Sequence, residues 1–151
     1  MQIVKTLLMK GFKTKTRPRK MKTTYKQLKE NQSKDFDNFP IFFAFNNEQF
    51  VKGLAKLQTT KESIASVGMG GFVAKEHTGD FRKMLDNHNN EMIESLKDDN
   101  FLIDALTYEL NNHEYCYTHD ITPTLEALQL KREEIRPEII KKAVRNCYRE
   151  D

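Results

Sequence analysis

His113, Cys116 and His119 carry the side chains best suited to metal binding or nucleophilic catalysis. They follow one another at intervals of three, and imidazole and thiolate are ligands that zinc prefers in tetrahedral sites. Cys116 is also a candidate nucleophile with a histidine as its base. A structural zinc site needs a fourth protein ligand, however, and no Cys-x-x-Cys motif accompanies these residues. We therefore predict no bound metal, and we keep a small enzyme or zinc module using His113, Cys116 and His119 as the alternative function.

The segment Gly68-Met69-Gly70-Gly71 invites comparison with phosphate-binding loops. The dinucleotide-binding pattern needs a glycine where Val73 stands, and no Gly-Lys-Ser/Thr motif follows. Glycines also supply the positive φ angles of tight turns. Apolar residues at 64–67 and 72–74 flank the segment, so the sequence predicts a β-hairpin rather than a phosphate cradle. We predict no cofactor.

The elements expected before this hairpin are two helices and one extended segment. Thr23 or Thr24 can cap a helix that runs through Gln32. Residues 39–45 are apolar, aromatic and interrupted by proline, which indicates a buried extended segment. Asn46 and Gln49 form a capping-box pattern, so a helix of about three turns should follow them.

The elements expected after the hairpin are four helices. Thr78 can cap a long amphipathic helix, and Asp98 or Asp99 can cap the next one. Thr122-Pro123 and Arg136-Pro137 start two further helices, because proline is favoured at the first helical position. On the long helix the expected apolar face consists of Phe81, Met84, Leu85, Met92, Ile93 and Leu96.

Together these elements predict an α+β fold, helix-dominated, with a short β-hairpin. The chain has 151 residues, 38% hydrophobic and 31% charged, which is typical of one globular domain. We expect a basic N-terminal arm at residues 1–22 and a single globular domain at residues 23–151. The expected aromatic core is Phe39, Phe42, Phe45, Phe50, Phe81 and Phe101.

Charge is distributed unevenly along the chain. Residues 1–30 carry ten Lys and Arg against one acid, Glu30, a net charge of +9, whereas residues 31–130 carry eight bases and sixteen acids, a net charge of −8. A basic arm on an acidic body suggests contact with nucleic acid or another acidic surface. A solubilising tail, a mitochondrial transit peptide and an optional extension before Met21 are the alternatives. The predicted contact residues are Lys10, Lys13, Lys15, Arg17, Arg19, Lys20 and Lys22.

The cellular compartment follows from what the chain lacks. Its longest apolar stretch, residues 39–45, is far shorter than the roughly 20 residues of a membrane-spanning helix. No secretory signal is evident, and the two cysteines form no disulfide framework. We expect a cytoplasmic protein with reduced thiols and no membrane contact.

Six short segments between Met21 and about Leu130 carry a family resemblance. They are Tyr25-Lys26-Gln27-Leu28-Lys29, Phe39-Pro40, Phe43-Ala44-Phe45-Asn46-Asn47-Glu48-Gln49-Phe50, Gly68-Met69-Gly70-Gly71-Phe72, Tyr108-Glu109-Leu110-Asn111-Asn112-His113-Glu114-Tyr115 and Thr124-Leu125-Glu126-Ala127-Leu128. Through them the chain resembles an uncharacterised family of small bacterial and phage-encoded proteins. The family has no assigned activity, so the resemblance implies no catalytic residue. This chain has Gln129 where the family pattern has glycine, and the basic arm and C-terminal helix are expected to be absent from other members.

In general character the chain is similar to anti-CRISPR proteins, which are small, intracellular and poor in motifs. An inhibitor needs no active site, only a stable fold and charges that match its target. We therefore expect a non-enzymatic binding protein of phage or mobile-element origin that inhibits or modulates a nucleic-acid-handling partner. The expected partner is RNA or a CRISPR RNA-guided nuclease complex.

Overall fold

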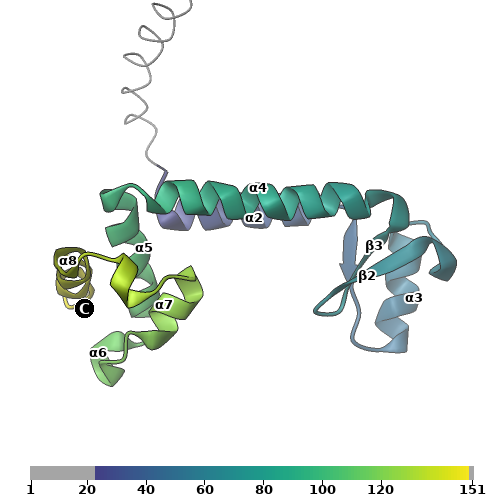
Figure 1. Cartoon of the computed structure of the whole chain (residues 1–151). Helices are drawn as coiled ribbons and strands as arrows, with labels where there is room; N and C mark the ends of the chain where they lie inside the picture. The colour runs from purple at the N-terminus through teal and green to yellow at the C-terminus, as the bar shows by residue number, and fades with distance from the viewer. Residues whose placement is uncertain (1–22, 150–151) are drawn as a thin grey trace, which may run out of the picture. The chain divides into compact units, whose positions relative to one another are not determined.

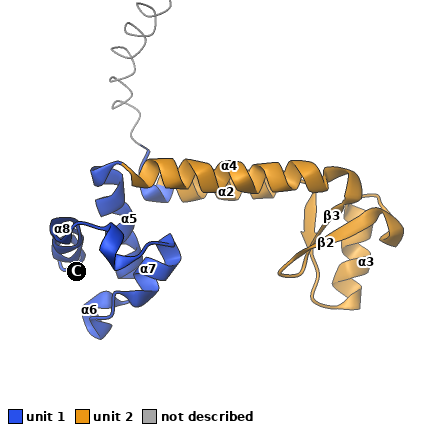
Figure 2. Cartoon of the chain, in the orientation of Figure 1, with its two compact units in different colours: residues 1–26, 98–151 blue, residues 27–97 orange. Residues whose placement is uncertain are grey.

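The computed structural model describes residues 23–149, which form two compact units (Figure 2). Residues 27–97 make up the mixed unit, and residues 98–149 with residues 23–26 make up the helical unit. Helices dominate both, and one small antiparallel sheet lies in the mixed unit. The prediction of an α+β, helix-dominated fold is confirmed, whereas the prediction of a single domain over residues 23–151 stays a prediction. No helix within the described range is long and apolar enough to cross a membrane.

The mixed unit combines three helices with a three-stranded sheet (Figure 1). Strand β3 is central, and both β1 and β2 pair with it in antiparallel fashion. In this register Phe42 of β1 and Ser66 of β2 lie opposite Phe72. The elements are α2 (Tyr25–Asn38, whose first two residues belong to the helical unit), β1 (Ile41–Phe43), α3 (Asn47–Lys56), η2 (Lys61–Ser63), β2 (Ile64–Gly68), β3 (Gly71–Ala74), η3 (Lys75–His77) and α4 (Thr78–Leu96).

Strands β2 and β3 form the predicted hairpin. Its turn residues, Met69 and Gly70, both have positive φ, 54° and 77°. Positive φ at both central positions is the requirement of the two-residue turn that matches the twist of hairpin strands. The glycine-rich segment is therefore a turn, as the flanking apolar residues indicated.

The aromatic residues of the mixed unit divide into buried and exposed sets. Ile41, Val73 and Phe81 form the buried core, and Phe36 and Phe39 pack against it. On the sheet, Phe42 is buried and its ring contacts those of Phe50 and Phe72. The prediction that Phe45 belongs to the core is wrong: Phe45 is 77% exposed. It follows the end of β1 and immediately precedes the N-cap of α3, so its side chain leaves the buried layer.

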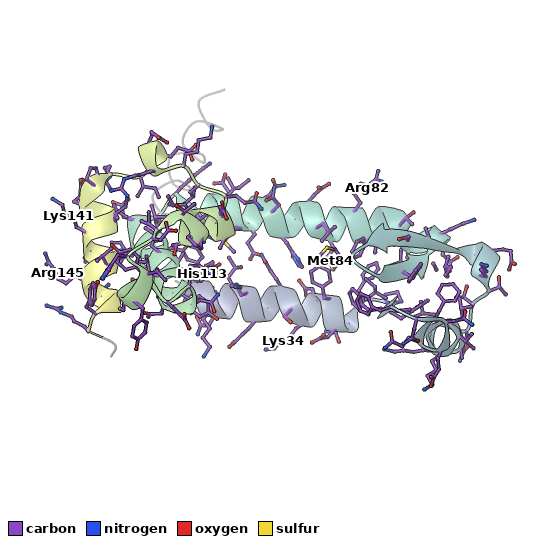
Figure 3. The ribbon with its side chains drawn as sticks, turned by 90° about the horizontal axis from the view of Figure 1, so that it is seen from below. Lys34, Arg82, Met84, His113, Lys141 and Arg145 are labelled. Carbon is purple, nitrogen blue, oxygen red and sulfur yellow. The ribbon has the colours of Figure 1, made fainter. Side chains whose placement is uncertain are left out.

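Helices α2 and α4 lie side by side and antiparallel in the mixed unit (Figures 1 and 3). The Gln32 side chain donates to the His88 carbonyl at 3.1 Å, and the Phe36 ring meets that of Phe81 edge-on. The expected apolar face of α4 is only partly buried, because Leu85 and Ile93 are exposed. Thr78 is also not the N-cap of α4. The N-cap is His77, the last residue of η3. The Thr78 hydroxyl donates to the Lys75 carbonyl instead.

The helical unit is built around α5 (Asp99–Asn112), against which α6 (Tyr115–Thr118), α7 (Thr122–Leu128) and α8 (Pro137–Cys147) pack (Figure 1). The short 3-10 helix η4 (Arg132–Glu134) lies between α7 and α8 in the sequence. The Asp98 carboxylate accepts a hydrogen bond from the Phe101 amide at 3.0 Å, which confirms Asp98 as the cap of α5. Helices α7 and α8 begin at the predicted proline positions. Ala105, Leu106 and Leu110 are fully buried, so α5 forms the centre of this unit.

Candidate functional site

The seven predicted contact residues of the arm, Lys10 to Lys22, lie outside the residues that the structure describes. The alternative set, His113, Cys116 and His119, lies in the helical unit around the end of α5 and in α6. His113 is the C-cap of α5, Cys116 is in α6, and His119 is the C-cap of α6. These positions place the candidate chemistry of the three residues in the helical unit, around the end of α5 and in α6.

Each of these three side chains has a different neighbour. His113 Nε2 lies 3.4 Å from Glu109 Oε2, and Cys116 Sγ lies 3.2 Å from Cys147 Sγ. His119 Nδ1 lies 3.0 Å from the Tyr148 hydroxyl. Within residues 23–149, no group of three or more His, Cys, Asp or Glu side chains is arranged to hold a metal ion. The structure thus does not bring His113, Cys116 and His119 together as one metal centre.

Glu109 is a buried carboxylate that the sequence analysis did not single out. It is 2% exposed, and the Tyr25 hydroxyl donates to its Oε1 atom at 2.6 Å. Its Oε2 atom accepts from Asn112 Nδ2 at 3.3 Å and lies near His113. A buried carboxylate requires hydrogen-bond donors because burial removes its hydration. These contacts satisfy that need and define the Glu109 network: Tyr25, Glu109, Asn112 and His113.

The Glu109 network attaches the first residue of α2 to α5. The Tyr25 amide also donates to Asp104 Oδ2 at 2.7 Å, so a carboxylate from α5 caps the start of α2. Burial, and then the hydrogen bond and charge of Glu109, raise the pKa of the Tyr25 phenol well above its ordinary value. The tyrosine stays neutral and remains a hydrogen-bond donor. Because Glu109 is buried and accepts a hydrogen bond from Tyr25, this network is suited to holding Tyr25 within the helical unit rather than to reacting with a substrate.

A sequence signal for Glu109 did exist. The residue follows Ala105 by four positions and Leu106 by three, so it lies on the buried stripe of α5. A charged residue on an apolar helical face indicates a buried polar contact, but its partner, Tyr25, is 84 positions away. The spacing within α5 could identify the acceptor but not its donor.

Cys116 and Cys147 form the second cluster, which we call the thiol pair. Cys147 is the last residue of α8 and is fully buried, while Cys116 is partly buried. The Cys147 thiol donates to Asn111 Oδ1 at 2.8 Å. Beside the pair, partial burial and the nearby thiols raise the pKa of the Tyr148 phenol. The sequence analysis treated Cys116 as a candidate ligand or nucleophile and did not anticipate that Cys147 would be its neighbour.

His88 in the mixed unit is a largely buried histidine with a carboxylate partner. It stands among three asparagines in the sequence, yet its side chain is only 12% exposed. Its Nε2 atom lies 2.8 Å from Asp35 Oδ2, and its ring contacts that of Phe36. His88 therefore joins α4 to α2 within the mixed unit.

Charge is segregated in the helical unit as well. Residues 98–130, which include α5, α6 and α7, contain seven acids and neither Lys nor Arg. Residues 131–149 contain seven Lys and Arg against three Glu, a net charge of +4. On α8, Ile139, Ile140 and Ala143 are buried, whereas Lys141, Lys142 and Arg145 are exposed. Figure 3 shows Lys141 and Arg145 projecting away from the neighbouring helices, and we call these three cations the basic face of α8.

An open depression of about 430 Å³ lies along α5. Asp104, Thr107, Tyr108, Asn111 and Asn112 line it, so its only formal charge is negative. This lining does not favour an anionic ligand such as a phosphate.

These observations define a helix-dominated α+β protein with a buried polar network, a thiol pair and segregated surface charge. The chain belongs to the "Family of unknown function (DUF7659)", whose model matches residues 24–150. No curated protein and no solved structure matches the chain.

The family match supports the expected membership of an uncharacterised family. The matched range includes α8, so the expectation that the C-terminal helix lies outside the family pattern is wrong. The match begins at residue 24, so the basic face of α8 lies inside the matched range and the seven predicted contact residues of the arm lie outside it.

Proposed function

We propose that this protein is a non-enzymatic binding protein that inhibits or modulates a nucleic-acid-handling partner. The partner we propose is a CRISPR RNA-guided nuclease or its guide RNA, which makes the protein an anti-CRISPR protein of phage or mobile-element origin. It acts in the cytoplasm, and RNA contact is made chiefly by the arm cations Lys10, Lys13, Lys15, Arg17, Arg19, Lys20 and Lys22.

The observation that carries this proposal is the separation of charge into blocks. Residues 1–30 have a net charge of +9, residues 98–130 contain seven acids and no Lys or Arg, and residues 131–149 have a net charge of +4. Clustered cations repel one another unless they are solvated or meet an anion. When Lys and Arg neutralise phosphates, the nucleic acid releases counterions, and this favours binding without base-specific contacts.

An RNA-guided nuclease offers surfaces of both signs. Its guide RNA presents phosphates, and its nucleic-acid channel is positively charged. The arm and the basic face of α8 are suited to bind the phosphates of the guide RNA. The acidic segment 98–130 is suited to bind the positively charged channel. Charge complementarity of this kind increases the association rate and selects the partner.

The alternative function, a small enzyme or zinc module, draws no support from the described geometry. His113, Cys116 and His119 each contact a different side chain, and Glu109 is buried against Tyr25. Catalysis by Cys116 would require a histidine within hydrogen-bond distance as its base. The Cys116 sulfur instead lies 3.2 Å from the Cys147 sulfur.

A binding experiment with charge-matched variants tests the proposal. The arm variant replaces the seven arm cations with Gln in the full chain. The control variant replaces seven exposed cations of the mixed unit with Gln, which changes the net charge by the same amount: Lys34, Lys52, Lys56, Lys61, Lys75, Arg82 and Lys83. Each protein is titrated against single-stranded RNA, a Cas9-type nuclease carrying its guide RNA, and the same nuclease without RNA.

We expect the arm variant to lose affinity for the RNA and for the loaded nuclease, while the control variant binds like the original chain. Loss of inhibition of DNA cleavage should accompany the loss of binding. Equal binding by the arm variant and the original chain would overturn the role of the arm. Failure of the original chain to bind any of the three probes would overturn the proposed partner class.

A further inference from the structure

We propose that Cys116 and Cys147 are a redox site. Small-molecule disulfides such as oxidised glutathione oxidise the two thiols to an intramolecular disulfide. The inference rests on the thiol pair alone and does not depend on the proposed function. It concerns a covalent modification that would join α6 to α8 in the helical unit.

The geometry of the two sulfur atoms carries this inference. They lie 3.2 Å apart although the residues are 31 positions apart in the chain. A disulfide bond is about 2.05 Å long, so the sulfur atoms need to approach by roughly 1.1 Å. We expect rotation about the side-chain torsions to provide that approach.

The two thiols differ in access, which assigns an order to the reaction. Cys116 is partly exposed, whereas Cys147 has no exposed surface. The Cys116 thiolate attacks one sulfur of oxidised glutathione, forms a mixed disulfide and releases one glutathione. Cys147 then attacks the Cys116 sulfur and expels the second glutathione. Two protein thiols lose their hydrogens to the two glutathione molecules, so one disulfide is consumed and one is formed.

The surroundings of Cys147 support its role as the second thiol. Its hydrogen is directed to Asn111 Oδ1 at 2.8 Å, which orients the sulfur beside Cys116. Oxidation removes this donor from Asn111 and replaces it with a covalent link. Because Cys147 ends α8, the link fixes the C-terminal end of the helix that carries Lys141, Lys142 and Arg145 (Figure 3).

The test treats the full chain with oxidised glutathione and follows its intact mass. We expect the mass to fall by two hydrogens, the two free thiols to disappear, and a peptide joining residues 116 and 147 to appear without reductant. Cys147→Ser should instead accumulate one glutathione adduct, because the exposed thiol reacts and nothing resolves it. Cys116→Ser should react much more slowly than Cys147→Ser, because its remaining thiol is buried.

Unfolding provides an independent readout. The oxidised chain should unfold at a higher denaturant concentration than the reduced chain, since the link restricts the unfolded chain, and reductant should reverse the shift. The double variant Cys116→Ser/Cys147→Ser should show no shift. A stable glutathione adduct on the original chain, a disulfide-linked dimer, or two thiols that remain unmodified would each overturn the proposal.

Discussion

Glu109 places a carboxylate in the interior of the helical unit, where it accepts a 2.6 Å hydrogen bond from Tyr25. A hydrogen bond to a charged group contributes more than one between neutral groups, because the unpaired charge would be costly to bury. The stability of the helical unit should therefore depend strongly on one phenolic hydroxyl.

We predict that Tyr25→Phe lowers the free energy of unfolding by about 2 kcal/mol. The ring still packs against Phe101 and Tyr108, so the loss reports the hydroxyl. Urea unfolding followed by circular dichroism measures the change. Tyr117→Phe is the matched control, since Tyr117 is 83% exposed and its variant should unfold like the original chain. Equal stability of the two variants would contradict the assigned role of Tyr25.

The same tyrosine predicts a loss of stability at high pH. Burial and Glu109 raise the pKa of Tyr25 above the ordinary value of 10.0, so the folded chain keeps a proton that the unfolded chain releases. The stabilising contribution is complete below about pH 10 and is lost as the pH rises toward the folded-state pKa, at up to about 1.4 kcal/mol per pH unit.

Urea unfolding from about pH 9 to about pH 11 measures this dependence. The difference in the free energy of unfolding between the original chain and Tyr25→Phe isolates the contribution of Tyr25. That difference should shrink as the pH rises. Parallel pH profiles for the two proteins would show that Tyr25 is not the responsible group.

Among the elements, α3 and β1 meet through a close contact between Gly53 and the Phe42 ring. Gly53 is buried in the interior of α3, where alanine would ordinarily favour the helix. A methyl group at this position would collide with the ring and force Phe42 to move. Overpacking of this kind outweighs helix propensity.

We therefore predict that Gly53→Ala destabilises the chain by about 1–3 kcal/mol. Gly79→Ala provides the control, because Gly79 is also in a helix, α4, and has no atom within 4 Å of an added methyl group. This second variant should be neutral or more stable by up to about 1 kcal/mol. The urea midpoint of Gly53→Ala should therefore lie below that of Gly79→Ala. A Gly53→Ala chain more stable than the original would contradict the predicted collision with Phe42.

The elements also show which features a sequence makes predictable. The cap of α3, the turn at Met69-Gly70 and the proline starts of α7 and α8 depend on neighbours a few positions apart, and the structure contains all of them. Capping and turn rules describe local interactions, so short patterns are sufficient to predict them.

Features that depend on distant residues were missed. Tyr25 meets Glu109 across 84 positions, His88 meets Asp35 across 53, and Cys116 meets Cys147 across 31. No local pattern links such pairs. The predicted core included Phe45 for a similar reason: its apolar character was evident, but the end of β1 was not. The redox proposal rests on the thiol pair, whose two cysteines become neighbours only in the folded chain, where α6 meets the end of α8.

At the scale of the whole molecule, our proposal rests on the distribution of charge along the chain. The arm, the acidic segment 98–130 and the basic region 131–149 alternate in sign along the sequence. The family model matches residues 24–150, which include the last two segments and leave the seven arm cations outside. We propose that these arm cations make the phosphate contacts.

The salt dependence of RNA binding tests this central claim most directly. Fluorescence anisotropy with a single-stranded RNA should be measured at several salt concentrations for the original chain, the arm variant and the control variant. With about five phosphates engaged at roughly −0.7 each, the original chain should lose about 10²-fold in affinity for each fourfold rise in salt. The control variant should keep this slope, and the arm variant should bind weakly with a much shallower one. If the arm variant keeps both the affinity and the slope of the original chain, the arm does not contact RNA and the account is contradicted.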